Sequence, residues 1–371
     1  MKSKRIVLVT WMGQGNYGSS LQSYALNQYL KILGYDVSFL QHLPRKYGIQ
    51  TYTKGILSLL GFRRIMSVLK RMTVQRKKLN KFQKAHYNEI KVYTRHQESS
   101  LLKRTDCFVT GSDQIWNTYF EFKPVFFLSF AGPAKRIAYA SSIGTSGIKD
   151  EYKELVKKYL LDFAHIGVRE KEAVRVISEL TGRNDICQVL DPTFLLSPSD
   201  WGTLAEEAQI EISIPGKYIF CYLIGESETY SEQLRVVRSK LQSIDNLVIV
   251  TSAENTSFNS EGAIVYRLGG PAEFVYLLRK ASFVCTDSFH ATALSINHSI
   301  PFVEFIRFQD NTVESQNSRI YDLLDRYELR NRIYDSKSLE WSQGINYSSI
   351  QELLSKDRKA SNDYLVNAIE K

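Results

Sequence analysis

The chain has 371 residues, a length that favours two domains, because single hydrophobic cores usually stop growing at about 250–300 residues. Hydrophobic residues make up 43% and charged residues 23%, as in ordinary globular proteins, so a sizeable core can be buried. The apolar run at residues 6–9 is shorter than a secretory signal or a membrane span requires, so we expect a first buried strand there and a cytoplasmic protein.

A basic segment carries much of the net charge of +9. Residues 63–84 are rich in Lys and Arg and contain no Asp or Glu, while Val68 and Leu69 give the same segment an apolar side. It is either a solvated helix face or a peripheral contact with anionic lipid or glycan at the inner membrane. No nucleic-acid-binding motif accompanies it, so nucleic acid is not an expected partner.

The cysteines suggest a reducing compartment. They are Cys107, Cys187, Cys221 and Cys285, and no two of them form a CxxC pair or match the spacing of a zinc site. Several lie in apolar, strand-like runs, so we expect reduced, buried thiols. No His, Asp and Glu cluster has ligand spacing either, so no metal is expected.

Strand and helix signals alternate along the chain. In the first half, strands are expected at 5–11, 35–40, 107–110, 136–140, 165–168 and 189–190, and helices at 20–33, 63–84, 151–163 and 170–180. In the second half, strands are expected at 217–223, 247–250, 282–286 and 301–305, and helices at 231–241, from Pro271, at 291–296 and from Ser349. This predicts an α/β protein with two Rossmann-like domains and mostly parallel sheets, at 1–200 and 201–345, followed by a C-terminal helix at 346–371.

Ligands of such folds bind at the carboxyl ends of the strands, so the loops that follow strands matter most. The first is Gly13-Gln14-Gly15-Asn16-Tyr17-Gly18, which matches the dinucleotide pattern GxGxxG. The acidic residue of that fingerprint is missing, because Asp36 lies at the start of the second strand rather than at its end. The segment is therefore a tight turn only or a turn that lets a substrate approach a helix N-terminus, with dinucleotide binding as the weakest alternative.

The second loop is Gly111-Ser112-Asp113-Gln114-Ile115-Trp116-Asn117, directly after an expected strand. Its carboxylate and amide groups suit sugar hydroxyls, and its indole suits the face of a pyranose. The alternative is a simple helix N-cap at Ser112 or Asp113.

The third loop is Thr286-Asp287-Ser288-Phe289-His290. A histidine here can transfer a proton near neutral pH, and the helix N-terminus beside it favours an anion, although a lone histidine is often structural. Arg169 and Arg319 follow as candidates for holding an anion, with surface ion pairs as the alternative.

Together these stretches resemble the polysaccharide pyruvyl transferase family. The resemblance spans residues 4–325. It rests on Gly15-Asn16-Tyr17-Gly18 with Leu21-Gln22 and Tyr24-Ala25-Leu26, Gly111-Ser112-Asp113-Gln114 with Trp116-Asn117, Val168-Arg169-Glu170, Asp191-Pro192-Thr193, Pro271-Ala272-Glu273-Phe274 and Thr286-Asp287-Ser288-Phe289-His290.

The resemblance implies a fold of the glycosyltransferase-B type, with the active site in the interdomain cleft, the acceptor on the N-terminal side and the donor on the C-terminal side. Such enzymes move the pyruvyl group of phosphoenolpyruvate onto two hydroxyls of a sugar in a surface or exopolysaccharide precursor, free or lipid-linked, and form a cyclic ketal. Phosphoenolpyruvate is a substrate, and no cofactor is implied. Several members carry an arginine where this chain has Ser288, so the charge that holds the donor must come from Arg169, Arg267, Arg307 or Arg319.

The expected roles follow from this resemblance. His290 is the general acid and Asp113 a candidate base, while Arg169, Ser288, Arg319 and Asp287 bind the donor. The residues expected at the acceptor are Gly15, Asn16, Tyr17, Gly111, Ser112, Trp116 and Asn117. Two other functions stay open: a nucleotide-sugar glycosyltransferase of the same fold, and a non-catalytic glycan-binding relative.

Overall fold

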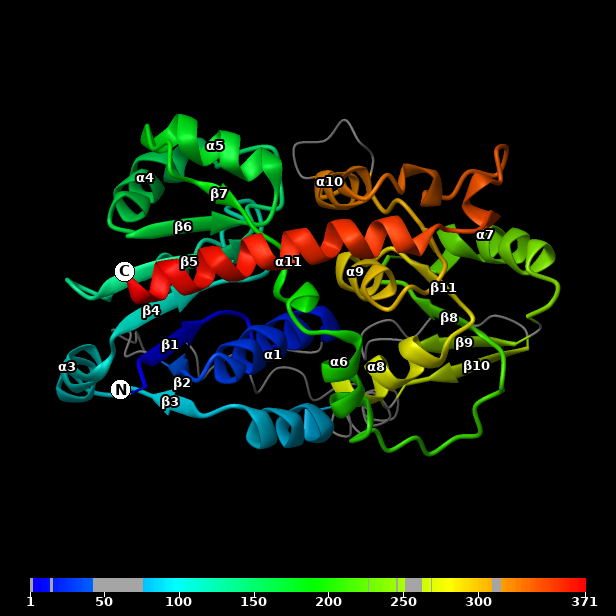
Figure 1. The fold of residues 1–371 in the computed structure, drawn as a ribbon, viewed down its shortest axis with the longest axis horizontal. Helices are drawn as coiled ribbons and strands as arrows, with labels where there is room; N and C mark the ends of the chain where they lie inside the picture. The colour runs from blue at the N-terminus through cyan, green and yellow to red at the C-terminus, as the bar shows by residue number, and fades with distance from the viewer. Residues whose placement is uncertain are drawn as a thin grey trace, which may run out of the picture.

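The fold consists of two parallel β-sheets covered by helices, shown in Figure 1 as a computed structural model. The structure describes residues 3–13, 16–42, 76–225, 227–244, 246–250, 262–267, 269–308 and 315–371. The prediction of an α/β fold with two mostly parallel sheets is confirmed. The two sheets lie on either side of the boundary predicted near residue 200.

The first sheet has the strand order β3-β2-β1-β4-β5-β6-β7, and all neighbours pair in parallel. Its strands are β1 (Arg5–Val9), β2 (Asp36–His42), β3 (Glu89–Lys91), β4 (Cys107–Thr110), β5 (Lys135–Ser141), β6 (His165–Val168) and β7 (Cys187–Gln188). Its helices are α1 (Tyr17–Ile32), α3 (Arg95–Arg104), α4 (Lys153–Leu161) and α5 (Lys171–Thr181), with a further helix at 76–86. The central strands β4 and β5 are buried almost along their whole length because both faces of the sheet are covered.

The second sheet has the order β10-β9-β8-β11-β12, again with parallel neighbours. Its strands are β8 (Ile219–Tyr222), β9 (Leu247–Val250), β10 (Ala263–Tyr266), β11 (Phe283–Thr286) and β12 (Phe302–Glu304). Its helices are α7 (Ser227–Lys240), α8 (Pro271–Lys280), α9 (Phe289–Asn297) and α10 (Ser318–Arg326), and α6 (Pro198–Ala205) lies in the connection between the sheets. Proline occupies the first turn of α6 and α8, where its missing N–H costs no hydrogen bond.

Several predicted bounds differ from the observed ones by two or more residues: α1 begins at Tyr17 rather than Ser20, and α7 begins at Ser227 rather than Ser231. The last strand of the first sheet is Cys187–Gln188 rather than 189–190, because the backbone N–H of Leu190 turns away to Ser361 Oγ. The final helix, α11 (Tyr347–Glu370), begins before Ser349, since Asn346 caps it by accepting from the N–H of Ser348.

Helix α11 returns from the second sheet to the first and ties the two halves together (Figure 1). Arg358 donates to the carbonyl of Phe194, and Tyr364 Oη donates to the carbonyl of Ala138 in β5. Near its end, Glu370 pairs with Lys4 at 2.9 Å, so the described ends of the chain meet.

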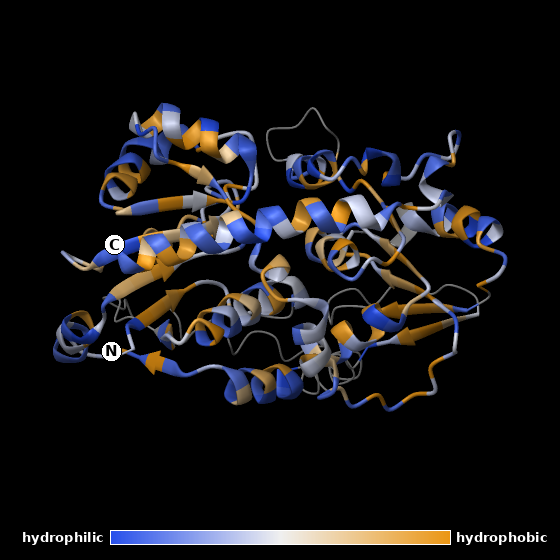
Figure 2. Ribbon diagram, viewed as in Figure 1, coloured by the Kyte–Doolittle hydropathy of each residue, from blue (hydrophilic) through white to orange (hydrophobic). Residues whose placement is uncertain are grey.

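One apolar core continues from the first sheet into the second. Tyr17 of α1 stacks on Phe274 of α8 with ring centroids 5.0 Å apart and donates its hydroxyl to the carbonyl of Gly269. Figure 2 shows that apolar residues predominate along the strands, whereas apolar and polar residues alternate around the helices. This shared core fixes how the post-strand loops of one half face those of the other.

The remaining sequence expectations concern thiols and membranes. All four cysteines are free, and only Cys187 is exposed. No helix in the described ranges is both long and apolar enough to cross a bilayer. Within the basic segment, residues 63–75 lie outside the described residues. In the described remainder, Lys78 is already paired with Glu273 at 3.1 Å.

Candidate functional site

A cavity of about 180 Å³ opens between the two sheets, where their post-strand loops meet. The first half of the chain contributes Trp11, Asn16, Ser19, Asp113, Gln114 and Phe120 to its lining. The second half contributes Ile224, Ser288, Phe289, His290, Arg307, Gln316 and Arg319. Both sheets therefore present their carboxyl ends to one site, as expected for folds of this kind.

The N-terminus of α1 forms one wall of the cavity. Asn16 caps the helix by accepting from the N–H of Gly18 at 2.8 Å. One turn on, Gln22 ties this helix to the neighbouring loops: its amide nitrogen donates to Thr10 Oγ1, and its amide oxygen accepts from the N–H of Ser112. Gln22 thus holds the loops after β1 and β4 together, although it does not line the cavity.

The loop after β4 places a carboxylate in the same wall. Asp113 has a left-handed backbone with φ of 73°, which turns its side chain toward α1. There it accepts from Ser19 Oγ at 2.5 Å and from the N–H of Gln114 at 2.9 Å. Asp113 is a fixed acceptor at the position predicted for a base.

His290 faces this wall from the first turn of α9 in the other domain. The histidine is 7% exposed, and its Nε2 has no hydrogen-bond partner among the described residues. Its ring lies against Gly18, where a Cβ atom would come within 2.2 Å of Nδ1. Burial lowers the pKa of His290, and the positive charges of Arg169 and Arg319 lower it further, against the opposing effect of Asp191 and Asp113. The ligand-free imidazole is therefore neutral at pH 7.

Two arginines supply positive charge to the cavity. Arg319, at the start of α10, is 5% exposed and donates hydrogen bonds to Gln316. Burial, together with the charges of Arg169 and Arg307, lowers the pKa of Arg319 to about 9, so it still carries its charge at pH 7. Arg307, after β12, has a buried Nε without a partner among the described residues. No described Asp or Glu forms an ion pair with either side chain.

Arg169 was predicted to bind the donor, but the structure places it behind the cavity wall. Its guanidinium pairs with Glu170 at 2.9 Å and with Asp191 at 3.1 Å, and it lies over the ring of Phe289. Because two carboxylates already compensate its charge, Arg169 does not present a free cation to the cavity.

Of the other predicted donor residues, Ser288 lines the cavity, but Asp287 does not. The carboxylate of Asp287 accepts from the N–H groups of Ile224 and Gly225 at 2.7 and 2.8 Å and from Tyr230 Oη at 2.8 Å. Asp287 therefore holds the loop after β8, and its negative charge would repel an anionic donor.

The predicted acceptor residues divide in the same way. Asn16 lines the cavity, and Gly15 lies outside the described residues. The others serve the scaffold and do not line it: Tyr17 in the interdomain core, Gly111 with a left-handed backbone against Tyr139, Ser112 bonded to Asp191, and Asn117 bonded to the N–H groups of Tyr119 and Phe120.

Trp116 was expected to stack on a sugar, and this was wrong. Its indole is 1% exposed, stacks on Phe127 and donates to the carbonyl of Phe126. The aromatic side chains at the cavity besides His290 are instead Phe289, Trp11, two residues after β1, and Phe120, which is 72% exposed. The rings of Trp11 and Phe120 meet edge to face at 6.0 Å.

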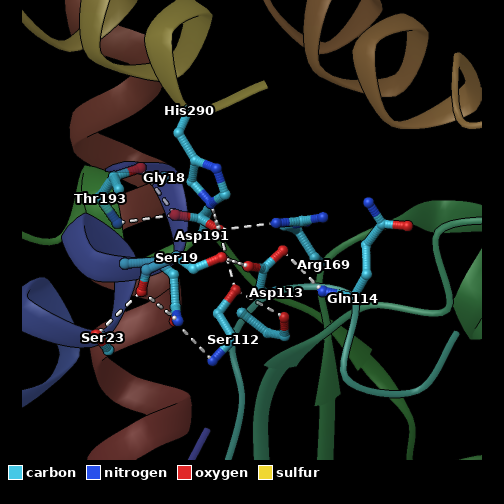
Figure 3. Close-up of polar contacts among 12 residues, drawn as sticks. Gly18, Ser19, Ser23, Ser112, Asp113, Gln114, Arg169, Asp191, Thr193 and His290 are labelled. Atoms are coloured by element: carbon cyan, nitrogen blue, oxygen red, sulfur yellow. Dashed lines mark hydrogen bonds and ion pairs between the residues drawn. The ribbon is translucent and has the colours of Figure 1, made fainter. Parts of the chain in front are cut away.

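Asp191 is a further residue of the site that sequence reasoning did not single out. Figure 3 shows its carboxylate between His290, Arg169 and Ser112. Asp191-Pro192-Thr193 was one of the stretches that carry the family resemblance, but no role was assigned to Asp191. Within the described parts of the chain, no cluster of three or more His, Cys, Asp or Glu side chains is placed to bind a metal.

Comparisons with known proteins agree with this geometry. A family model described as polysaccharide pyruvyl transferase matches residues 16–307. No curated protein sequence matches the chain. Among solved structures, Arabidopsis thaliana UGT89C1 complexed with UDP-L-rhamnose is similar over 100% of this chain and 99% of its own, with a TM-score of 0.53 and 11% identity.

A putative UDP-N-acetylglucosamine 2-epimerase from Listeria monocytogenes matches over 99% of this chain and 91% of its own, with a TM-score of 0.49 and 11% identity. At 11% identity the similarity to the Arabidopsis thaliana structure shows the fold alone, which is of the glycosyltransferase-B type.

Proposed function

This chain belongs to the polysaccharide pyruvyl transferase family, and from that premise we propose that it transfers the pyruvyl group of phosphoenolpyruvate to a sugar of a surface or exopolysaccharide precursor. The observation that carries the proposal is the pair of cationic side chains, Arg307 and Arg319, that reach the cavity without a carboxylate partner among the described residues. A buried cation costs free energy unless an anion compensates it. Phosphoenolpyruvate offers a phosphate and a carboxylate, and arginine binds both groups through two parallel hydrogen bonds.

Arg307 and Arg319 can supply the positive charge that several family members place at the position of Ser288. Ser288 leaves room beside His290, and Arg307 and Arg319 bring positive charge to the same cavity from β12 and α10. In this proposal the donor lies against Ser288, with its anionic groups on the two guanidinium groups.

A nucleotide-sugar donor fits this site less well. The cavity of about 180 Å³ is smaller than the roughly 300–1,000 Å³ of typical sites for larger ligands. In addition, the N–H groups of Ile224 and Gly225, which follow the central strand of the second sheet and suit a phosphate, already bind the carboxylate of Asp287. Asp287 thus occupies a place that a diphosphate would use.

The reaction makes one demand on His290. A proton must reach C3 of the enol so that the methylene becomes a methyl group, and an acceptor hydroxyl must bond to C2. The bond from C2 to the phosphate oxygen then breaks, and a second hydroxyl closes the ketal. The two acceptor hydroxyls release two protons in all. One balances the proton that C3 takes up, and the other leaves with the phosphate. His290 can deliver the proton to C3 once the donor's negative charges have raised its proton affinity, a role typically contributing about 10²–10⁴-fold.

The acceptor fits the part of the cavity lined by the first half of the chain. Asp113 and Asn16 offer oxygen acceptors to sugar hydroxyls, while Trp11 and Phe120 offer the apolar faces that a pyranose ring covers. Because Asp113 lines the cavity, it can accept a proton from the acceptor hydroxyl that attacks C2. The acceptor sugar is thereby proposed to enter past the exposed ring of Phe120.

We also propose that the protein works in the cytoplasm and meets a lipid-linked acceptor through residues 63–84. The exposed Arg76, Lys77, Lys81 and Lys84 on the helix at 76–86 support this contact. Flotation with anionic and neutral vesicles tests it, and equal binding to both kinds of vesicle would contradict it.

Turnover tests the proposed reaction directly. Wild-type protein and the His290→Gln variant are incubated with phosphoenolpyruvate and glycan precursors, phosphorus NMR follows the donor, and proton NMR follows the product. We expect inorganic phosphate and a new ketal methyl signal with wild type, and neither with the variant. Consumption of a nucleotide sugar, with phosphoenolpyruvate left intact, would overturn the proposal in favour of a glycosyltransferase.

A further inference from the structure

The site contains a buried carboxylate to which the proposed function gives no role. Asp191 follows β7 at the carboxyl end of the first sheet and is 2% exposed. Its Oδ1 accepts from the N–H and the hydroxyl of Thr193 at 3.0 and 2.8 Å. Its Oδ2 accepts from Ser112 Oγ at 2.9 Å and from Arg169 Nη1 at 3.1 Å.

These four donors compensate the carboxylate for its burial. Burial alone would raise the pKa of Asp191, but Arg169, the Thr193 hydrogen bonds and His290 when protonated outweigh it and lower the pKa below its usual value. Asp191 is therefore ionised at neutral pH. It lies on the first domain and is rigidly held, since three separate segments donate to it.

His290 approaches the same oxygen from the second domain. Its Nε2 lies 3.7 Å from Asp191 Oδ2, which is too far for a hydrogen bond, and the contact becomes an ion pair when the ring is protonated. The nitrogen is buried and has no hydrogen-bond partner among the described residues, so Asp191 is the acceptor positioned to receive its N–H (Figure 3).

We propose that Asp191 is the residue that positions His290 for proton transfer, and that Arg169 serves the site by holding Asp191 rather than by binding the donor. This inference rests on the proposed function for the identity of the reaction, but the pairing of Asp191 with His290 does not depend on it. By holding Nε2, Asp191 fixes the orientation of the imidazole ring in the site. Its negative charge also stabilises the imidazolium that forms when the anionic donor binds. It acts through His290 and is a positioning residue.

Several charged groups face His290, so the effect of Asp191 must be separated from that of the others. They are Asp191 after β7, Asp113 after β4, Arg169 after β6 and Arg319 of α10, while α1 presents the uncharged Gly18. Asp191 has the larger effect of the two carboxylates. Replacing each carboxylate by its amide therefore separates the role of Asp191 from the general field of the site.

The first experiment is a pH titration of the ligand-free protein with ¹⁵N-labelled histidines, read by NMR. The six histidines are few enough to assign, and His290→Gln identifies the signal of interest. We expect Asp191→Asn to lower the titration midpoint of His290 by about 1–3 pH units, as removal of a close opposite charge does. Asp113→Asn is the matched control and should give a smaller shift. An unchanged midpoint in Asp191→Asn, or a larger shift in Asp113→Asn, would overturn the proposal.

A second experiment keeps the inference testable if Asp191→Asn does not fold. Arg169→Lys retains the buried positive charge, and Arg319→Lys makes the same change at a cavity-lining arginine. Calorimetry with phosphoenolpyruvate should show Arg169→Lys within about threefold of wild-type affinity and Arg319→Lys weakened about tenfold or more, because lysine cannot bind bidentately. Arg169→Lys should instead lower kcat. Equal loss of affinity in both variants would refute the positioning role of Arg169.

Failure of the inference and failure of the proposed function give different results. The titration needs no donor, so it reports on Asp191 and His290 even if phosphoenolpyruvate is not the substrate. If phosphoenolpyruvate binds to none of the proteins while the titration shift is present, the pairing stands and the donor is wrong. If the donor binds and the shift is absent, the donor stands and Asp191 is only structural.

Discussion

Replacing Gly18 by alanine should remove activity while leaving the fold intact. Gly18 lies in the first turn of α1, and a Cβ atom there would lie 2.2 Å from Nδ1 and 2.8 Å from Cγ of His290. The imidazole would have to retreat by about 1 Å, and a misplacement of that size in a reacting group can cost about 10²-fold in rate. Alanine itself is favoured over glycine in helices by about 0.5–1 kcal/mol, which offsets part of the steric cost to stability.

The assay combines turnover of phosphoenolpyruvate with thermal unfolding. We expect Gly18→Ala to lose at least about 10²-fold in kcat with little change in Tm. Gly147→Ala is the matched control, because no atom lies within 4 Å of the Cβ added there, and it should behave as wild type in both assays. Wild-type turnover in Gly18→Ala would refute the placement of His290 at the reacting centre.

Burial and charge lead to three other predictions. Because burial lowers the pKa of His290, donor binding at pH 7 should take up a proton, seen as a buffer-dependent binding enthalpy that is lost in His290→Gln. Phe120→Ala should raise the KM for the acceptor with stability retained, whereas Trp116→Ala should cost about 3–5 kcal/mol of stability as a core truncation. Burial raises the pKa of Glu304 well above its usual value, so the folded state keeps a proton that the unfolded state releases above about pH 4.3. The free energy of unfolding should therefore fall with rising pH by up to about 1.4 kcal/mol per pH unit, and Glu304→Gln should lose this part of the slope; an unchanged slope in chemical denaturation across pH would contradict it.

The sequence predicts the fold and the general location of the site well, because both follow from local patterns. Alternating strand and helix signals define the two sheets, and the carboxyl-end rule selects the loops that contain Asn16, Asp113 and His290. Short strands with few apolar residues cannot be predicted in this way. β3 (Glu89–Lys91) has too few apolar residues to signal a strand, and it forms by pairing with β2 at the edge of the sheet.

Individual roles within a loop depend on contacts that no local pattern records. Trp116 and Phe120 are four residues apart in irregular chain, where no period assigns one to the core and the other to the cavity. Arg169 reads as a free cation until its distant partner Asp191 is placed beside it. Asp287 reads as a site residue until the N–H groups of the loop after β8 are seen to occupy its carboxylate.

Donor binding is the most direct test of the central claim that this cavity holds a small molecule with two anionic groups. Calorimetry compares phosphoenolpyruvate with UDP- and GDP-sugars on wild type, on Arg319→Gln and on Arg175→Gln, a control in an exposed ion pair of α5. We predict saturable binding of phosphoenolpyruvate to wild type and to Arg175→Gln, and at least about tenfold weaker binding to Arg319→Gln. Binding of a nucleotide sugar, with no response to phosphoenolpyruvate, would contradict the account.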